Sequence, residues 1–247
     1  MICMRTLILE LISFKEMWVM TISDKLITED EFNAIIDYLE EQDFNFYTGD
    51  GEVEILNAKY FSTLFQAIYN GVFNNETNAV LDIICALTID DLNIGKDKAA
   101  VTIYHGKENE YTVDIPRQLG IDMFNVATDD FYCRNRNGVF RVNNMIQTEK
   151  SIFKTPSKRT GGTDYKSAPT YLRRIAKKII QKVFNGEKNI SFKAIYFSGI
   201  FNRIQNAGIE LKFQNLLEGE GRKLYEKECK RVGLKSPYMV LRHYFCC

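Results

Sequence analysis

Five cationic side chains lie along one short apolar stretch, and their spacing makes them the best candidates in this chain for binding an anionic partner. We call them the basic row: Arg173, Arg174, Lys177, Lys178 and Lys182. They alternate with Leu172, Ile175, Ala176, Ile179, Ile180 and Val183, whose helical spacing predicts an amphipathic helix with cations on its outer face. No Asp or Glu lies among them to form the ion pairs that a merely solvated helix usually carries. Such a row suits a phosphate backbone, and an anionic membrane surface or plain solvent are the alternatives.

The charges of the whole chain are divided between its two halves. Residues 1–149 contain 11 Lys and Arg against 25 Asp and Glu, a formal balance of −14, and residues 150–247 contain 21 against 7, a balance of +14. The 247-residue chain therefore has no net charge, although its second half is strongly basic. A surplus of this size attracts polyanions, of which nucleic acid is the commonest in a cell. The alternative is that the acidic half neutralises the basic half internally.

Several kinds of chemistry have few candidate residues. There are two His, and the chain has no Gly-rich phosphate loop, no nucleophile elbow and no His-Glu-x-x-His motif. The six Cys form no Cys-x-x-Cys pair, so a zinc site is poorly supplied, although His243, Cys246 and Cys247 are potential ligands. We therefore expect no metal and no cofactor, and the free thiols suit a reducing cytoplasm.

Composition and charge divide the chain into four segments. Residues 1–24 are apolar but interrupted by charges, which predicts a packing segment and no membrane span. An acidic half, residues 25–153, is followed by a polar loop, residues 154–169, where the charge changes sign. Residues 170–247 form a basic helical half that ends in an apolar docking tail, residues 238–245.

The hydrophobic pattern predicts a mainly α fold with small antiparallel hairpins, which belongs to the α+β class. A capping box at Thr28–Glu31 begins the first helix, which runs to about Glu41. Further helices are expected at 60–73, 78–87, 172–183, 192–207 and 211–231. Hairpins are expected at 44–55, 99–115 and 131–142, the last around Asn137-Gly138.

The order of several short motifs resembles the catalytic domain of the tyrosine recombinases, the phage integrase family. In chain order these are a cap at Leu26–Glu31, a turn at Tyr69-Asn70-Gly71, Ala86–Leu92, a hairpin turn with Gly106-Lys107, and Ile190–Ser198 followed by Gly208–Leu211. Each motif is short, and their order over roughly residues 25–225 carries the resemblance. It implies a recombinase-like fold that faces DNA.

The residues that the family needs for strand transfer are mostly replaced here. The family uses two Arg and a Lys around the scissile phosphate, His groups for proton transfer and a Tyr nucleophile. After Gly71 this chain has Val72, Phe73 and Asn74, and the second box, His-x-x-Arg, becomes Lys193-Ala194-Ile195-Tyr196. Lys107 and Tyr225 keep the residue types of the family. Tyr238–His243 also reads like the second box, but only four residues follow it, which leaves no room for a nucleophile.

The resemblance and the basic row together predict the DNA contacts. Lys107 would approach DNA from a hairpin turn, and Lys158 and Arg159 from the polar loop. Lys193 and Arg203 come from the element that would carry the second box, and the basic row would line the phosphate backbone. Asn202, Gln205 and Asn206 have amides that could read bases.

The sequence thus predicts a non-catalytic regulator that binds double-stranded DNA, resembling integrase-derived lysogeny regulators of temperate phages and acting in the bacterial cytoplasm. Because the chain lacks the additional DNA-binding domain of the family, we expect a homo-oligomer or a related protein partner. One alternative is an interaction protein that antagonises a related repressor. Another is an active strand-transfer enzyme that uses Tyr225.

Overall fold

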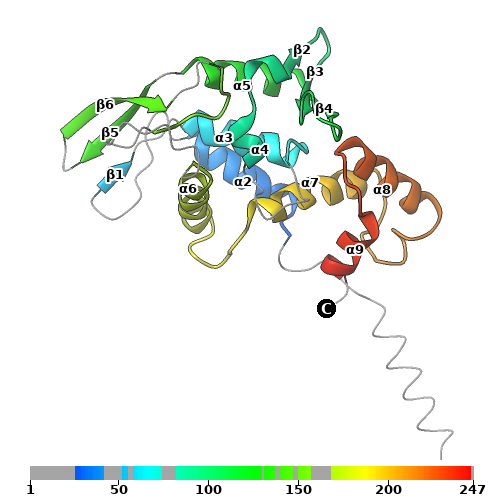
Figure 1. The fold of residues 1–247 in the computed structure, drawn as a ribbon. Helices are drawn as coiled ribbons and strands as arrows, with labels where there is room; N and C mark the ends of the chain where they lie inside the picture. The colour runs from blue at the N-terminus through cyan, green and yellow to red at the C-terminus, as the bar shows by residue number, and fades with distance from the viewer. Residues whose placement is uncertain are drawn as a thin grey trace, which may run out of the picture.

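The computed structural model describes residues 26–41, 52–54, 58–73, 82–129, 131–136, 139–146, 150–156 and 168–245 (Figure 1). Its helices are α2 (Glu29–Glu40), α3 (Ala58–Tyr69), α4 (Asp82–Ala86), α5 (Arg117–Thr128), α6 (Ala168–Val183), α7 (Phe192–Asn206), α8 (Gly219–Arg231) and α9 (Pro237–Phe245), with a 3-10 turn η1 (Ile89–Asp91). Its strands are β1 (Glu52–Glu54), β2 (Leu92–Ile94), β3 (Lys98–Ile103), β4 (Tyr111–Pro116), β5 (Phe131–Arg136), β6 (Val139–Ile146) and β7 (Thr155–Pro156). The predicted α+β class is therefore confirmed.

The core is built around the two central helices α3 and α7. Helix α3 buries most of its side chains and packs against α2, α5 and α7. Helix α7 buries Phe192 and every residue from Ala194 to Asn202. Close approach of the two helices depends on Gly199, because a Cβ there would lie 1.9 Å from the carbonyl oxygen of Tyr69. Figure 1 shows α7 running through the middle of the molecule.

Two antiparallel sheets flank this helical core. One sheet has the order β2-β3-β4, with Ala99 opposite Ile115 and Val101 opposite Val113. Helix α5 packs against β3, and α8 contacts β4. The other sheet has the order β1-β5-β6-β7, and its β5–β6 hairpin projects from one side of the molecule (Figure 1).

Many of the predicted elements are confirmed. Thr28 and Glu31 form the predicted capping box, in which the Glu31 amide donates to the Thr28 hydroxyl and the Thr28 amide donates to the Glu31 carboxylate. The hairpins at 99–115 and 131–142 are present, the second as strands β5 and β6. Helices α6 and α7 begin and end close to their predicted bounds.

Other elements differ from the prediction. The helix expected from Leu211 begins only at Gly219, because Leu211, Phe213 and Leu216 turn inward and bury their side chains in a non-helical segment. Strand β2 and helix α5 were not predicted. The hairpin at 44–55 lies largely outside the described residues, and its described part, β1, pairs with the distant β5.

The predicted terminal segments and the polar loop are only partly described. Residues 1–24, most of the 154–169 loop, and Cys246 and Cys247 lie outside the described residues. The tail at 238–245 forms helix α9, which buries Leu241, Tyr244 and Phe245 against its own chain. In the described part of the chain, no helix is both long and apolar enough to cross a membrane.

Candidate nucleic-acid interface

Helix α6 presents the basic row on its outer face. Leu172, Ile175 and Ile179 are fully buried, and the helix packs against α2, α4 and β7. Within the basic row, Lys178 is half-buried and the other four side chains are exposed. No Asp or Glu occurs in Ala168–Val183, so the charged side chains of the helix are all cations. This arrangement can follow a phosphate backbone, which it would position without reading its sequence.

Lys107 lies in the turn between β3 and β4. The turn is closed by backbone bonds from Lys107 to Tyr104 and from Glu110 to Lys107, at 2.9 and 3.0 Å. The Gly106 amide also donates to the Glu110 carboxylate at 2.7 Å. The Lys107 ammonium lies 5.7 Å from the centre of the Tyr104 ring. The structure therefore fixes an exposed Lys107 on a well-formed turn, beside two acidic residues, Glu108 and Glu110.

Lys193 stands at the rim of a pocket formed by α7, α9 and the segment between α8 and α9. The pocket has a volume of about 600 Å³. We call it the α7–α9 pocket; it is lined by Lys193, Phe197, Leu234, Lys235, Ser236, Met239, Val240, His243 and Tyr244. Apart from Tyr244, the ionisable residues that line this pocket are basic: Lys193, Lys235 and His243. This part of the surface thus combines positive charge with an apolar floor.

Arg203 does not lie where the prediction needs it. Its guanidinium is turned inward, where Nε donates to Glu228 at 2.8 Å and Nη1 donates to the Tyr69 carbonyl at 3.2 Å. Arg231 approaches the same carboxylate from α8, at 2.9 Å, and donates to the Asn70 carbonyl at 3.0 Å. The two guanidiniums therefore donate hydrogen bonds to carbonyl oxygens at the carboxyl end of α3. In this conformation the hydrogen bonds of Arg203 stabilise the fold.

In this Arg203–Glu228–Arg231 cluster, the two arginines hold the Glu228 carboxyl in its ionised form. Burial acts to raise the pKa of Glu228, but the hydrogen bonds and charges of Arg203 and Arg231 outweigh it and lower that pKa below its ordinary value. Burial and the neighbouring Arg231 lower the pKa of Arg203. The Nη2 atoms of both arginines are buried without a hydrogen-bond partner. One carboxylate thus compensates two guanidiniums.

The positions that the resemblance relates to catalysis hold packed aromatic side chains. The rings of Phe73 and Tyr196 lie 5.1 Å apart, and the Tyr196 hydroxyl donates to the Val232 carbonyl at 3.4 Å. Tyr225 is 2% exposed and its hydroxyl donates to the Pro237 carbonyl at 2.7 Å. Burial raises the pKa of the Tyr225 hydroxyl far above its ordinary value, which disfavours the phenolate. In this conformation Tyr225 presents no nucleophile at the surface.

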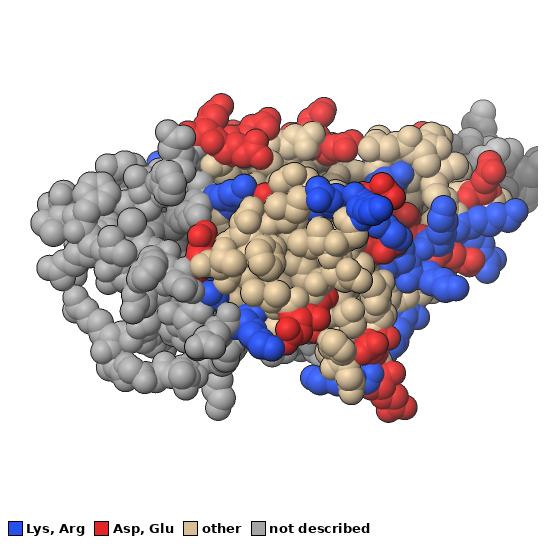
Figure 2. All heavy atoms as spheres, turned by 90° about the horizontal axis from the view of Figure 1, so that it is seen from above, with Lys and Arg blue, Asp and Glu red and all other residues tan. Residues whose placement is uncertain are grey.

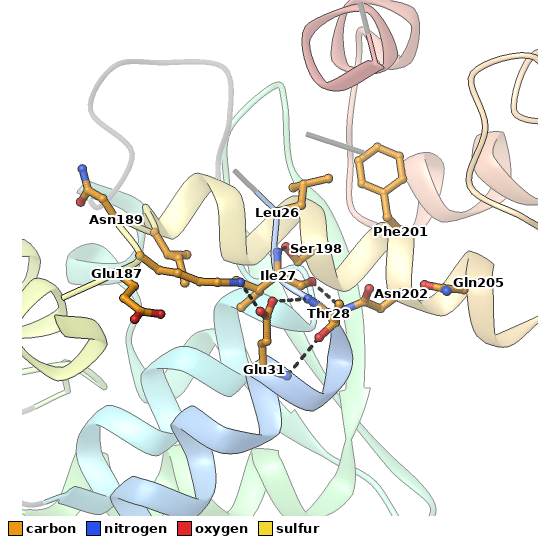
Figure 3. Close-up of a pocket in the computed structure, with 12 residues that line it drawn as sticks. Leu26, Ile27, Thr28, Glu31, Glu187, Asn189, Ser198, Phe201, Asn202 and Gln205 are labelled. Carbon is orange, nitrogen blue, oxygen red and sulfur yellow. Dashed lines mark hydrogen bonds and ion pairs between the residues drawn. The ribbon is translucent and has the colours of Figure 1, made fainter. Parts of the chain in front are cut away.

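A second pocket marks where the acidic and basic halves join. It lies between residues 26–31, residues 187–190 and α7, and has a volume of about 480 Å³ (Figure 3). There the Ile27 amide donates to the Ser198 hydroxyl at 2.9 Å, and Asn202 donates to the Ile27 carbonyl at 3.2 Å. Glu31 forms an ion pair with Lys188. Asn202, one of the suggested base readers, is thus buried and occupied by structural hydrogen bonds, while Gln205 and Asn206 are exposed.

Charges of both signs are unevenly spread over the surface. Figure 2 shows Lys and Arg gathered towards the end of the molecule that carries α8, and Asp and Glu along another edge. In the described part of the chain, the ion pairs Lys188 with Glu31 and Lys150 with Asp90 join residues 1–149 to residues 150–247. The basic-half pairs with Arg203, Lys212, Arg222 and Arg231 involve carboxylates of the same half.

The predicted contacts therefore fall into separate groups. The basic row shares one helix face, Lys193 lies at the α7–α9 pocket, and Lys107 lies on its turn. Lys158 and Arg159 lie outside the described residues. Among the described residues, no group of three His, Cys, Asp or Glu side chains could hold a metal ion.

Sequence reasoning missed Lys235 and His243 as lining residues and Glu228 as the partner of Arg203. Helical spacing offers one signal, since Glu228 and Arg231 are three residues apart on α8. The pairing of Glu228 with Arg203 has no local signal, because the two residues lie on different helices. A search of protein-family models and of curated protein sequences found no match to this chain.

Proposed function

We propose that this protein is a non-catalytic, DNA-binding regulator with an integrase-like fold, encoded by a phage or prophage. The observation that carries the proposal is the outward-facing basic row on α6, a helix without a single acidic residue. Five cations on one face match the charge of a phosphate backbone and supply the sequence-independent part of DNA affinity. Base contacts elsewhere would supply operator choice.

The order of the described elements supports the integrase-like part of the proposal. A capped helix, α2, precedes a helix that ends at Tyr69, and a sheet follows whose turn holds Lys107. Helix α7 then begins within the stretch that resembles the second conserved box. These elements contain the motifs on which the resemblance rests.

The absence of strand cleavage is proposed from the chemistry of the replaced positions. Phe73 and Tyr196 bring a packed aromatic pair where charge-stabilising arginines would be needed. Loss of one such donor costs about 3–4 kcal/mol of transition-state stabilisation, and here two positions are affected. The Tyr225 hydroxyl is buried and hydrogen-bonded to the Pro237 carbonyl, which also argues against strand cleavage. We therefore propose that the protein grips DNA without cutting it.

The double reversal Arg173→Glu with Arg174→Glu tests the DNA-binding face. Fluorescence anisotropy with a labelled duplex should show affinity reduced about tenfold or more for every sequence, since both lost contacts are to phosphates. The matched control is Lys223→Glu with Lys227→Glu, which changes the net charge equally on exposed positions of α8. We expect the control to bind nearly as well as the unchanged protein.

Equal losses in the two variants would mean that net charge alone matters and would contradict a dedicated face on α6. A second measurement tests the regulatory part, by competing a duplex from the neighbouring genomic DNA against a shuffled duplex. A regulator should prefer the genomic duplex, whereas equal binding to both would leave only a charged surface.

A further inference from the structure

The α7–α9 pocket has features that DNA binding does not use. Its floor is made of Phe197, Leu234 and Tyr244, which are buried in the core and are therefore fixed in place. Tyr244 packs against Phe197 with ring centres 5.1 Å apart. The volume of about 600 Å³ falls within the range of about 300–1,000 Å³ that is typical of small-molecule sites.

The segment that forms one wall of the pocket is held from several sides. Val232 accepts a hydrogen bond from Tyr196, and a Cβ at Gly233 would lie 2.6 Å from the ring of Tyr111. Gly233 has a φ of +67°, so this close approach also needs a conformation that favours glycine. Leu234 follows directly and is buried. The wall is thus anchored to β4 and α7 before any ligand arrives.

The ionisable groups at the rim of the pocket are basic. Lys193 comes from the first turn of α7, Lys235 from the anchored segment and His243 from α9. The described lining residues include no Asp or Glu. The Lys193 ammonium lies 5.9 Å from the centre of the Phe197 ring, which places a cation directly above the apolar floor.

We propose that the α7–α9 pocket binds a small organic anion with an apolar body, such as a medium-chain carboxylate. The charged head would meet Lys193, whose ammonium lies above the apolar floor, and the body would cover Phe197, Leu234 and Val240. Met239, which is 61% exposed at the rim, offers flexible apolar surface for the same body. A phosphodiester backbone would satisfy the cations but would leave the apolar floor uncovered, which favours an amphipathic ligand.

Binding can be measured without DNA, so its outcome is independent of the proposed regulatory function. The probe is anilinonaphthalene sulfonate, an aromatic anion whose fluorescence rises in apolar surroundings. Decanoate should displace the probe from the full-length protein. Decanol, which has the chain without the charge, and inorganic phosphate, which has charge without the chain, should displace it at least about tenfold less effectively.

Variants locate the site. Lys193→Glu should weaken decanoate binding about fivefold or more, because the cation above the apolar floor is reversed. The control is Lys223→Glu, which makes the same charge change on an exposed position of α8 outside the pocket. Met239→Glu adds a negative charge at an exposed rim position and should also weaken binding without disturbing the core.

Three results would overturn the proposal. Equal displacement by decanol would mean a merely apolar patch, and displacement by phosphate as effective as that by decanoate would mean a plain anion site. Unchanged decanoate affinity in Met239→Glu, in a protein that still unfolds cooperatively on heating, would place the ligand elsewhere.

Discussion

Arg203 and Arg231 hold the carboxyl end of α3 through their guanidiniums, and Glu228 stands between them. This cluster ties α3 and α7 to α8, and Arg231 also donates to the Asp114 carbonyl of β4 at 3.3 Å. The sequence predicts that Arg203 contacts phosphate, because Arg203 is a cation in the basic half of the chain. The sequence does not show which residue pairs with that cation. The partner lies on another helix, and only the packing of α7 against α8 brings the two together.

Replacing Glu228 with Gln tests this cluster. The change leaves two neighbouring guanidiniums partly buried without their carboxylate, so we expect a loss of about 2–3 kcal/mol in the free energy of unfolding. Chemical denaturation followed by circular dichroism measures it. Glu226→Gln is the matched control, because its ion pair with Arg222 is exposed on the same helix and should matter little. Equal effects of the two substitutions would contradict a structural role for the cluster.

Acid should destabilise the protein through the same carboxylate. The pKa of Glu228 is lower in the folded protein than its ordinary value of 4.5, so the folded state binds the proton less readily. Its contribution is complete above pH 4.5 and is lost as the pH falls through the folded pKa. Thermal unfolding from pH 6 down to pH 3 should therefore show a larger loss of stability for the unchanged protein than for Glu228→Gln. Parallel curves would show that Glu228 titrates alike in both states.

At the scale of elements, the position of α7 depends on how closely it approaches the end of α3. Gly199 allows that approach, and the turn after α3 needs Gly71, whose φ is +102°. The sequence predicted both helices from their apolar spacing, because that spacing is a local property. It did not predict α5, although Leu119, Met123, Val126 and Ala127 repeat at helical spacing and are buried. The sequence prediction began helix α8 too early, at Leu211. Leu211, Phe213 and Leu216 are apolar residues at a spacing compatible with a helix, but they pack into the core from a non-helical segment.

Gly199→Ala should separate the two central helices. The new Cβ would lie 1.9 Å from the Tyr69 carbonyl, so the helices must move apart. The steric clash should cost more than the gain of about 1 kcal/mol that Ala brings over Gly in a helix interior. We therefore expect the free energy of unfolding to fall by about 1–3 kcal/mol in total. Gln205→Ala is the control on an exposed position of α7, and it should change stability little. A Gly199→Ala protein as stable as the control would contradict the close contact.

For the whole molecule, the division of charge seen in the sequence persists in the fold. Among the described residues, the ion pairs Lys188 with Glu31 and Lys150 with Asp90 join residues 1–149 to residues 150–247, and four of the five side chains of the basic row are exposed. The sequence predicted the row and its exposure, since both follow from one helix and its apolar stripe. It could not predict the α7–α9 pocket, which needs three segments in contact. The pocket and the Arg203–Glu228–Arg231 cluster are products of tertiary packing.

The salt dependence of DNA binding tests the central claim, that the basic row engages a phosphate backbone. Affinity of the full chain for a duplex should be measured by anisotropy at several salt concentrations. If all five cations neutralise phosphates, the logarithm of the affinity should fall with the logarithm of salt at a slope of about −4 or steeper. In Arg173→Glu with Arg174→Glu, the slope should be shallower by about 2. An affinity that is indifferent to salt, or a slope that the double reversal leaves unchanged, would contradict DNA binding through α6.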